Sequence, residues 1–337
     1  MGMVRVLSAD DVSALLDLEA VLPVVEDAFS AQYAGTVERP ERPHYPIGIG
    51  RGESPETPQG TGLCMPAYVH GSPYAATKLA TVFEGNPERG LPTVSAQIAL
   101  VDADTGEPVA YLDGTAVTSA RTGCIGGLAA RELALEEPVT LGVIGAGTQA
   151  RWQTRAIAAA TALVRVRIYS PSASREECAA DLEATLDSSV DVSAVSSPAA
   201  ALEDAMVVVT ATTSTEPVFD GDDLEPGALV IAVGAYTESM RELDDRTVDR
   251  AGRVYADVPD EARETGDLRG HDGLAVHPFG GLFAADSDVP GSVDDPRATS
   301  DDVIVLSSVG SAVLDAATAT HLYERAGEAG YGTDVDL

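Results

Sequence analysis

The chain has 337 residues, which is long enough for two domains with separate hydrophobic cores. Its 54 acidic side chains against 21 basic ones give a formal net charge of -33, so nucleic acid and anionic membrane surfaces are poor partners. The acids are spread along the chain rather than gathered in a tail. We therefore expect a solvated acidic surface of halophilic type, suited to a very salty cytoplasm in which ions screen the self-repulsion.

Lysine is almost absent from the sequence. Of the 21 basic residues only Lys78 is a lysine, and it lies in the apolar segment 75–80. It is either a chance survivor on a strand edge or an amine that arginine cannot replace, because lysine can shift its pKa and exchange a proton near neutrality. The residue types alone leave both interpretations open.

The cysteines and the apolar runs bear on where the protein works. Cys64, Cys124 and Cys178 are odd in number and lack the spacing of a metal or redox site, which favours a reduced compartment. The N-terminal residues lack a basic segment followed by an apolar one, and no apolar run is long enough to span a bilayer. We expect a cytoplasmic protein that binds no metal and no membrane.

The first part of the chain predicts a mixed α and β unit. Ser8 to Asp11 form a capping box before an amphipathic helix, and Asp104-Thr105-Gly106 has the chemistry of a hairpin turn. The Pro- and Gly-rich stretch 38–62 predicts a loop or irregular edge strands. The remaining patterns are strands at 4–7, 63–69, 74–83, 93–102 and 108–113, and helices at 18–33 and 115–132.

Residues 139–150 carry the strongest local pattern in the chain. The apolar run 139–144 ends in Gly145-Ala146-Gly147, and Thr148, Gln149 and Ala150 lead into an alanine-rich helix at 151–163. In a strand–turn–helix, Gly145 allows the sharp bend, Gly147 leaves room for a pyrophosphate, and Ala150 lets the helix pack closely. The helix N-terminus offers free N–H groups to the phosphates. An ordinary strand-to-helix turn is the alternative, and the flanking elements favour a dinucleotide site.

Strands and helices continue to alternate after this turn, which is typical of a parallel sheet. Strand patterns lie at 164–169, 190–195, 206–210, 229–233, 253–256 and 303–306, helices at 174–186 and 310–326, and an acidic loop at 286–302. We predict an α/β fold in which 131–310 form a Rossmann-type, doubly wound parallel-sheet domain that binds NAD(P). Residues 1–130 and 311–337 would form a second, discontinuous α+β domain, because the last helix is expected to return to the first part of the chain; the resemblance described next implies that this domain binds the substrate and forms the dimer.

Several segments, taken in order, resemble the ornithine cyclodeaminase/μ-crystallin family. No single segment is specific, but the ordered set covers nearly the whole chain with compatible spacing. The matching stretches are Met65-Pro66-Ala67-Tyr68, Lys78 with Phe83-Glu84-Gly85-Asn86-Pro87 and Gly90-Leu91-Pro92, Asp104 to Pro108, Thr118-Ser119-Ala120-Arg121-Thr122-Gly123, Gly145 to Ala150, Glu216-Pro217-Val218-Phe219, Arg241-Glu242-Leu243-Asp244 and Ser307-Ser308-Val309-Gly310.

The resemblance implies a Rossmann domain joined to a substrate domain that forms an intersubunit β-barrel in a homodimer. It implies NAD or NADP as cofactor and a small amino or imino acid as substrate, for a cyclodeaminase, an alanine dehydrogenase or a cyclic-ketimine reductase. By motif, Lys78 matches the active-site lysine and Arg121 the arginine that grips the substrate carboxylate. Arg42 matches the second such arginine, with Arg39 as an alternative. Further cofactor contacts are expected from Thr212, Val233, Gly234 and Val309.

General chemistry agrees with these roles. The planar fork of arginine holds a carboxylate through two charge-assisted hydrogen bonds. A lysine close to two arginines has its amine pKa lowered, which makes it a better proton carrier near neutral pH. A helix-surface arginine paired with one of the many acids is the alternative for Arg121.

Two positions bear on the reaction and on the cofactor. Cyclodeaminases of the family carry an aspartate where this chain has Tyr236, a far weaker base, although Glu238 could substitute if the loop shifts. Ser170 ends the second strand of the nucleotide domain, where an acid would bind the ribose 2′-hydroxyl of NAD. Together with Ser172 and Arg175 it could accept a 2′-phosphate, which gives a slight preference for NADP over NAD.

Three hypotheses follow. The first is an NAD(P)-dependent oxidoreductase of a small 2-amino or imino acid. The second is ornithine cyclodeaminase, a lyase that recycles its hydride. The third is a non-catalytic, μ-crystallin-like binding protein, and the presence of Lys78, Arg121 and the glycine turn argues against it.

Overall fold

The computed structural model describes residues 2–51, 55–135, 138–235, 237–264, 266–284 and 299–336. The chain divides into two compact units. The mixed-sheet unit consists of Met1–Asp17, Ala34–Arg121 and Ala312–Leu337, and the parallel-sheet unit consists of Leu18–Tyr33 and Thr122–Ser311. Together they confirm the α/β fold with a discontinuous second domain that the sequence predicted.

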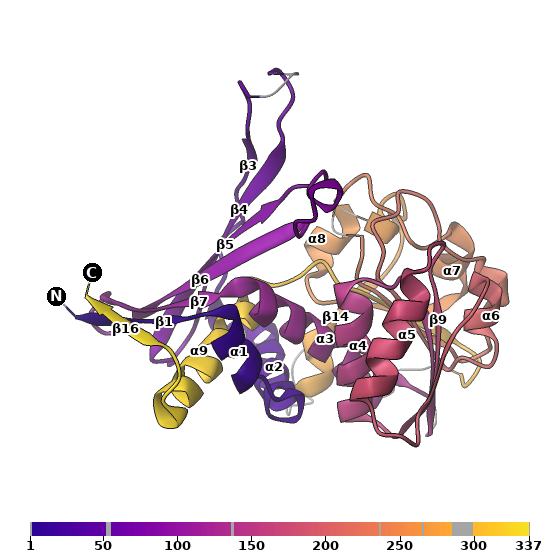
Figure 1. The fold of residues 1–337 in the computed structure, drawn as a ribbon. Coiled ribbons are helices and arrows are strands. Elements are labelled where there is room, and N and C mark those ends of the chain that lie inside the picture. The colour runs from indigo at the N-terminus through magenta and orange to yellow at the C-terminus, as the bar shows by residue number, and fades with distance from the viewer. Residues whose placement is uncertain are drawn as a thin grey trace. The chain divides into compact units, whose positions relative to one another are not determined.

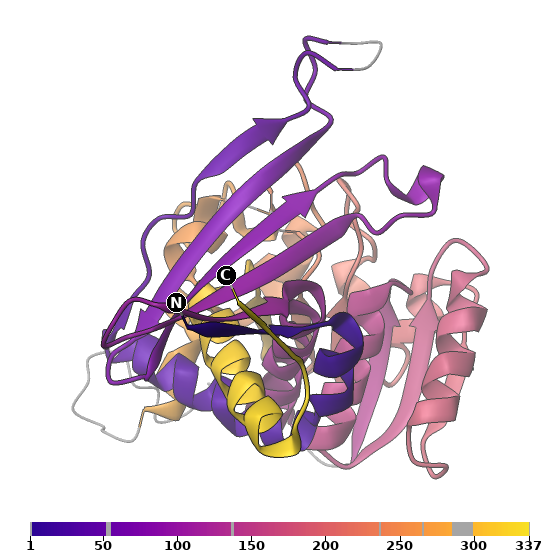
Figure 2. The same ribbon diagram turned by 60° about the vertical axis from the view of Figure 1, so that its left-hand side comes forward.

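The mixed-sheet unit is built on one sheet with the strand order β16-β1-β7-β6-β5-β4-β2, and β3 pairs with β4 beyond this path. Its strands are β1 (Met3–Leu7), β2 (Val37–Glu38), β3 (His44–Ile47), β4 (Gly60–Val69), β5 (Tyr74–Val82), β6 (Val94–Asp102), β7 (Pro108–Asp113) and β16 (Thr333–Asp336). Its helices are α1 (Ala9–Leu15), η1 (Pro87–Arg89), the first part of α3 (Gly114–Leu133) and α9 (Ala312–Ala329). Strands from the two ends of the chain, β1 and β16, lie side by side (Figure 2).

Local chemistry explains the connections in this unit. The capping box is present, since Ser8 accepts from the Asp11 N–H while the Asp11 carboxylate accepts from the Ser8 N–H. The Asp102 carboxylate accepts from the N–H groups of Asp104 and Thr105, and Gly106 has a φ of 74°, so the predicted hairpin turn is confirmed. Helix α9 packs on β4 and β5, which brings the end of the chain back to its first part (Figure 1).

Among its described residues, the parallel-sheet unit has eight strands, all parallel, in the order β10-β9-β8-β11-β12-β15-β13-β14. They are β8 (Val139–Ile144), β9 (Leu163–Tyr169), β10 (Asp191–Ala194), β11 (Val207–Thr210), β12 (Leu229–Ala232), β13 (Ala251–Ala256), β14 (Val276–Pro278) and β15 (Val303–Ser307). The helices are α2 (Leu18–Tyr33), α4 (Thr148–Ala160), α5 (Ser174–Thr185), α6 (Pro198–Leu202), α7 (Asp245–Arg250), α8 (Pro259–Glu264), η2 (Gly221–Asp223), η3 (Gly266–Leu268) and η4 (Phe279–Phe283), with the rest of α3.

The strand order changes direction between β8 and β11, since the chain moves outward through β9 and β10 and then returns to the other side of β8. In an open parallel sheet a ligand binds at the carboxyl ends of the strands beside such a switch point. Strands β11, β12 and β15 are buried along their whole length and therefore on both faces.

Two details differ from the sequence predictions. Helix α4 begins at Thr148 rather than Arg151, because Gly147 is its N-cap, and it ends at Ala160, because β9 begins at Leu163. Helix α2 lies within the parallel-sheet unit, where the fully buried Phe29 packs on the rings of Phe279 and Phe283. The predicted acidic loop at 286–302 lies largely outside the described residues.

Candidate active site

Lys78 lies in the middle of the mixed sheet and not on a strand edge. It is on β5, between Met65 of β4 and Ile98 of β6, and its exposed fraction is 4%. Because side chains alternate along a strand, Ala76, Lys78 and Ala80 share the buried face, while Leu79 points to the other face and is exposed. The only lysine of the chain is therefore a buried residue, and the chance-survivor interpretation does not fit its position.

A carboxylate from the far end of the chain meets this amine. Lys78 Nζ lies 2.5 Å from Asp315 Oδ2 and 3.3 Å from Thr118 Oγ1. The other carboxylate oxygen, Asp315 Oδ1, accepts from Arg121 Nε at 3.0 Å and from Thr118 Oγ1 at 3.0 Å. Thr118 and Arg121 are on α3 and Asp315 is on α9, so one strand and two helices build the cluster. Lys78, Arg121 and Asp315 are all buried.

The electrostatics of this cluster favour a mobile proton on Lys78. Burial lowers the pKa of Lys78 from 10.5 to about 8; Asp315 opposes this effect, and the charges of Arg121 and Arg42 add to it. Burial by itself would raise the pKa of Asp315, but the charges of Arg121 and Lys78 and the hydrogen bonds from both together outweigh burial and hold that pKa below its usual value. At neutral pH the cluster thus holds two cations and one anion.

The two candidate arginines upstream are both half-buried. The charge of Arg42 reaches Lys78 and contributes to the lowering of its pKa. This favours Arg42 over Arg39 as the second arginine of the cluster, in the part of the chain that the structure describes.

The glycine turn after β8 has the shape that a dinucleotide needs. Gly145 has a φ of 116°, a conformation that L-residues rarely adopt, and an added Cβ would collide with the Ala211 carbonyl. Gly147, in contrast, is extended, and an added Cβ there would meet nothing within 4 Å. Ala150, in the first turn of α4, is fully buried. No side chain caps the N-terminus of α4, so its first N–H groups are open to an anion.

Side chains around the turn also fit a ligand. Arg151 donates to the carbonyl oxygens of Ala146 and Gly147 and forms an ion pair with Asp181. These contacts stabilise the conformation of the turn. The Oε1 atom of Gln149 is buried without a hydrogen-bond partner among the described residues. An acceptor left unpaired in this way is costly in a finished core, and a bound donor would satisfy it.

Ser170 follows β9, at the position where an NAD-binding domain would carry an acid. Its hydroxyl lies 3.1 Å from that of Ser174, which lies 2.7 Å from that of Ser172. Arg175 donates to the Ser170 and Ser172 carbonyl oxygens and pairs with Glu176 at 3.0 Å. The end of β9 is therefore a small cluster of hydroxyl groups beside one guanidinium.

The other predicted cofactor residues lie at the carboxyl ends of neighbouring strands. Thr212 follows β11, Val233 and Gly234 follow β12, and Val309 follows β15. The N–H groups of Thr212 and Gly234 donate to the Glu242 carboxylate, and the N–H of Val309 donates to the Asp257 carboxylate at 3.0 Å. Both acids are buried.

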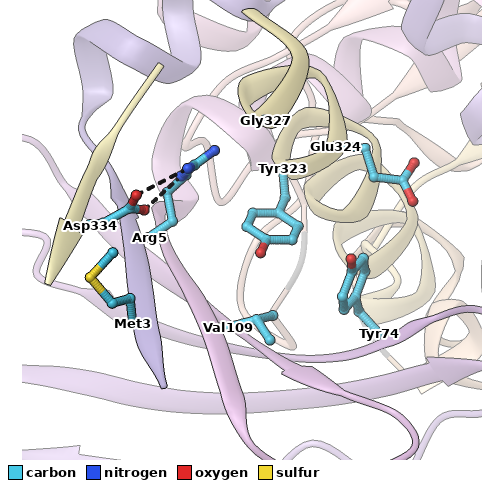
Figure 3. A pocket seen from close by; sticks show the side chains of 8 residues that line it. All are labelled: Met3, Arg5, Tyr74, Val109, Tyr323, Glu324, Gly327 and Asp334. Atoms are coloured by element: carbon cyan, nitrogen blue, oxygen red, sulfur yellow. Dashed lines mark hydrogen bonds and ion pairs between the residues drawn. The ribbon is translucent and has the colours of Figure 1, made fainter. Parts of the chain in front are cut away.

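A cavity of about 400 Å³ opens elsewhere in the mixed-sheet unit (Figure 3). It is lined by the Arg5–Asp334 ion pair, the edge-to-face rings of Tyr74 and Tyr323, and four further residues, and it contains none of the predicted site residues. Tyr323 is eight positions after Asp315 on α9, or about 12 Å along the helix. We therefore do not assign the reaction to this cavity.

Sequence reasoning missed Asp315, Glu242 and Asp257 as functional candidates. A signal for Asp315 was present, because it is an acid among the buried apolar residues 312–319 of a helix. Tyr236 lies outside the described residues. Glu238, its possible substitute, is exposed and pairs with Arg269 at 3.1 Å.

The parallel sheet, its switch point and its glycine turn define a Rossmann-type dinucleotide-binding protein. The chain belongs to the Ornithine cyclodeaminase/mu-crystallin family, whose sequence model matches residues 3–330. This confirms the resemblance that the sequence motifs indicated.

Its relatives include several enzymes. It is 36% identical over 270 residues to a Delta(1)-pyrroline-2-carboxylate/Delta(1)-piperideine-2-carboxylate reductase of Azospirillum brasilense, with 80% of this chain and 81% of the relative covered. The solved Delta(1)-pyrroline-2-carboxylate reductase of Thermococcus litoralis, in complex with NADH and L-proline, is 29% identical with a TM-score of 0.87, covering 98% of this chain and 100% of that chain. An archaeal alanine dehydrogenase dimer with bound NAD is 28% identical with a TM-score of 0.86 and covers 100% of both chains.

None of the helices in the described ranges is long and apolar enough to cross a membrane. The same residues contain no group of three or more His, Cys, Asp or Glu side chains that could hold a metal ion.

Proposed function

We propose that the protein is an NAD(P)H-dependent reductase of a small cyclic imino acid. The broader class is an NAD(P)-dependent oxidoreductase of a small amino or imino acid, in keeping with its family and with the enzymes it is similar to. The observation that carries the finer proposal is the buried cluster of Lys78, Arg121 and Asp315. It combines a proton carrier with a carboxylate-binding group in a chain that resembles imino acid reductases.

Each residue of the cluster has a role in this proposal. When bound, the reduced nicotinamide supplies a hydride to the carbon of the substrate C=N bond. Lys78 donates a proton to the nitrogen, so the double bond becomes an N–H-bearing single bond and the charges balance. Its pKa of about 8 leaves it protonated at neutral pH but a better donor than an exposed lysine.

Arg121 and Arg42 hold the substrate carboxylate in this proposal. The Nε of Arg121 is already engaged by Asp315 at 3.0 Å, so the substrate takes the terminal nitrogens. Asp315 fixes the plane of the guanidinium, and a fixed fork loses less freedom when it binds a carboxylate through two bonds.

The lyase alternative has less support. The family resemblance places an aspartate of cyclodeaminases at the position of Tyr236, and the neighbouring Glu238 is bound to Arg269 at the surface. The non-catalytic alternative leaves the single buried lysine, with its lowered pKa, without a purpose. A substrate assay with ornithine and with a cyclic imino acid distinguishes both alternatives from the reductase.

We further propose that NADPH is preferred over NADH. The support is the cluster of Ser170, Ser172, Ser174 and Arg175 after β9, where an NAD enzyme would place an acid. Ser170→Asp should lower the ratio of kcat/KM for NADPH to that for NADH at least tenfold, because an aspartate repels a 2′-phosphate and accepts from a 2′-hydroxyl. Ser188→Asp, at an exposed site, is the control. An unchanged ratio in Ser170→Asp would refute the preference.

A homodimer in the cytoplasm is also part of the proposal. The outer face of the mixed sheet exposes Val6, Tyr111 and Leu79, and such an apolar face is typical of an interface. Tyr111→Arg should give a monomer by light scattering, while Val164→Arg, at a site of the same 39% exposure on the other sheet, should not. A wild-type protein that is monomeric would contradict the dimer.

A further inference from the structure

Glu242 is a buried acid that joins the ends of two strands of the parallel sheet. Its Oε2 accepts from the Thr210 hydroxyl at 2.8 Å and from the Gly234 N–H at 2.8 Å, and its Oε1 accepts from the Thr212 N–H at 2.6 Å. Thr210 is the last residue of β11, Thr212 follows that strand, and Gly234 follows β12. Where strands end, their N–H groups lose ladder partners, and this one carboxylate replaces them.

The strand ends that Glu242 holds are in direct contact with the glycine turn. A Cβ on Gly145 would collide with the Ala211 carbonyl and lie 3.3 Å from the Thr212 methyl group. A Cβ on Gly234 would collide with both the Thr212 carbonyl and Glu242. The backbone of the turn after β8 thus packs directly on the residues after β11, and these pack directly on the residues after β12.

Glu242 is itself fixed in place. Its own N–H and that of Leu243 donate to Asp267 Oδ1 at 2.6 and 2.7 Å, and its carbonyl oxygen accepts from the Val218 N–H. Burial, with a contribution from the charge of Asp267, raises the pKa of Glu242 to about 7, while the hydrogen bonds from Thr210 and Thr212 lower it. A buried acid is costly to keep, and an apolar side chain would serve a simple core better.

We propose that Glu242 is a positioning residue for the dinucleotide, holding Thr212 and Gly234 in the backbone conformation that the cofactor contacts. This inference rests on the proposed function, because it takes the carboxyl edge of the parallel sheet as the cofactor site. The same device recurs one strand pair further along, where Asp257 holds the Val309 and Gly310 N–H groups and the Ser308 hydroxyl at the end of β15.

Glu242→Gln tests this role, because it keeps the size of the side chain but turns one of the two acceptor atoms into a donor. Either orientation of the amide sets N–H against the N–H of Thr212 or of Gly234. Loss of a charge-assisted hydrogen bond of this kind should weaken NAD(P)H binding about 10- to 100-fold. The KM for NAD(P)H should rise by a similar factor, while the KM for the imino acid stays within about twofold.

Asp244→Asn is the matched control. Asp244 also accepts three hydrogen bonds, from the Gly221 N–H and from the N–H and hydroxyl of Thr247, but none from the ends of β11 or β12. It should lower the melting temperature and leave NAD(P)H affinity unchanged. A parallel loss of affinity in both variants would mean that Glu242 is only structural.

The measurement is a fluorescence titration of NAD(P)H without substrate, beside a thermal melt. If the wild-type protein binds no NAD(P)H, the proposed function fails. If it binds and Glu242→Gln binds equally well, only the positioning role is overturned. Should Glu242→Gln not fold, Thr210→Val removes one of the three bonds and should weaken binding about 3- to 10-fold. An unchanged affinity in that variant would overturn the role as well.

Discussion

Replacing Lys78 by methionine removes the buried amine and with it the hydrogen bond to Asp315 Oδ2, while the bonds to Oδ1 remain. Asp315 would still accept from Arg121 Nε at 3.0 Å and from the Thr118 hydroxyl at 3.0 Å. The drop in the Lys78 pKa from 10.5 to about 8 corresponds to roughly 3 kcal/mol against the charged form in the folded protein. Methionine is spared that cost, which offsets the lost bond to Asp315 Oδ2, so we expect Lys78→Met to fold and to melt at or somewhat below the temperature of the wild type.

Activity should respond quite differently. Without a proton donor, Lys78→Met should lose at least about a hundredfold in kcat, or roughly 2.7 kcal/mol in the barrier. Lys78→Arg should not restore it, because a guanidinium does not release its proton near neutral pH and its fork is larger than an ammonium group. If Lys78 were only a counter-charge to the substrate, Lys78→Arg would mainly raise KM.

Asp315→Asn provides the contrast to the lysine variants. It leaves Lys78 and Arg121 buried without their counter-charge, which should cost about 3–5 kcal/mol of stability. It should also lower the pKa of Lys78 further, because Asp315 is the group that raises it. Steady-state kinetics and thermal melts of the three variants are the assay. Near-wild-type kcat/KM in both lysine variants would remove Lys78 from the site and weaken the enzyme assignment with it.

The remaining predictions concern pH, the glycine turn and salt. The kcat/KM for reduction should fall above about pH 8, where Lys78 loses its proton, and a kcat/KM that does not change with pH would count against Lys78. The free energy of unfolding should rise with pH between about 8 and 10.5, because the unfolded chain then binds more protons than the folded one. Gly147→Val should keep the fold, since a Cβ at this position meets nothing within 4 Å, but should abolish NAD(P)H binding in calorimetric titration. Unchanged binding in this variant would contradict the cofactor site. Gly145→Val, in contrast, should damage the fold itself. With a net charge of -33, removing molar potassium chloride should lower the melting temperature, and coinciding melts would refute the halophilic interpretation.

Local patterns predicted the elements whose form depends on nearby residues. Strand β7 (Pro108–Asp113) and the buried strand β8 (Val139–Ile144) were predicted with their observed bounds, since hydrophobic alternation or continuity defines them. The short strands β3, β14 and β16 were not predicted as such. Each is three or four residues long and exists through its pairing partner, which a local pattern does not contain.

The candidate site likewise contains residues that the sequence predicted and one residue that only the tertiary structure reveals. Lys78 and Arg121 were selected by residue type and by the family motifs, and the structure places both in one buried cluster. Asp315 is separated from Arg121 by 194 positions and from Lys78 by 237, so only the packing of α9 on the mixed sheet brings it there. The predicted lowering of the Lys78 pKa by neighbouring arginines holds, but burial is its largest cause and Asp315 opposes it.

The most direct test of the proposed reaction is the absorbance of NAD(P)H at ~340 nm, the wavelength of the reduced nicotinamide. Purified protein in molar potassium chloride would receive NADPH or NADH with Delta(1)-pyrroline-2-carboxylate, and in parallel NAD(P)⁺ with ornithine, with Lys78→Met as the blank. A cyclic imino acid reductase oxidises one NAD(P)H for each proline formed, and Lys78→Met does not. Ammonia released from ornithine with no net change in absorbance would instead identify a cyclodeaminase, and no turnover in either reaction would contradict the proposed function.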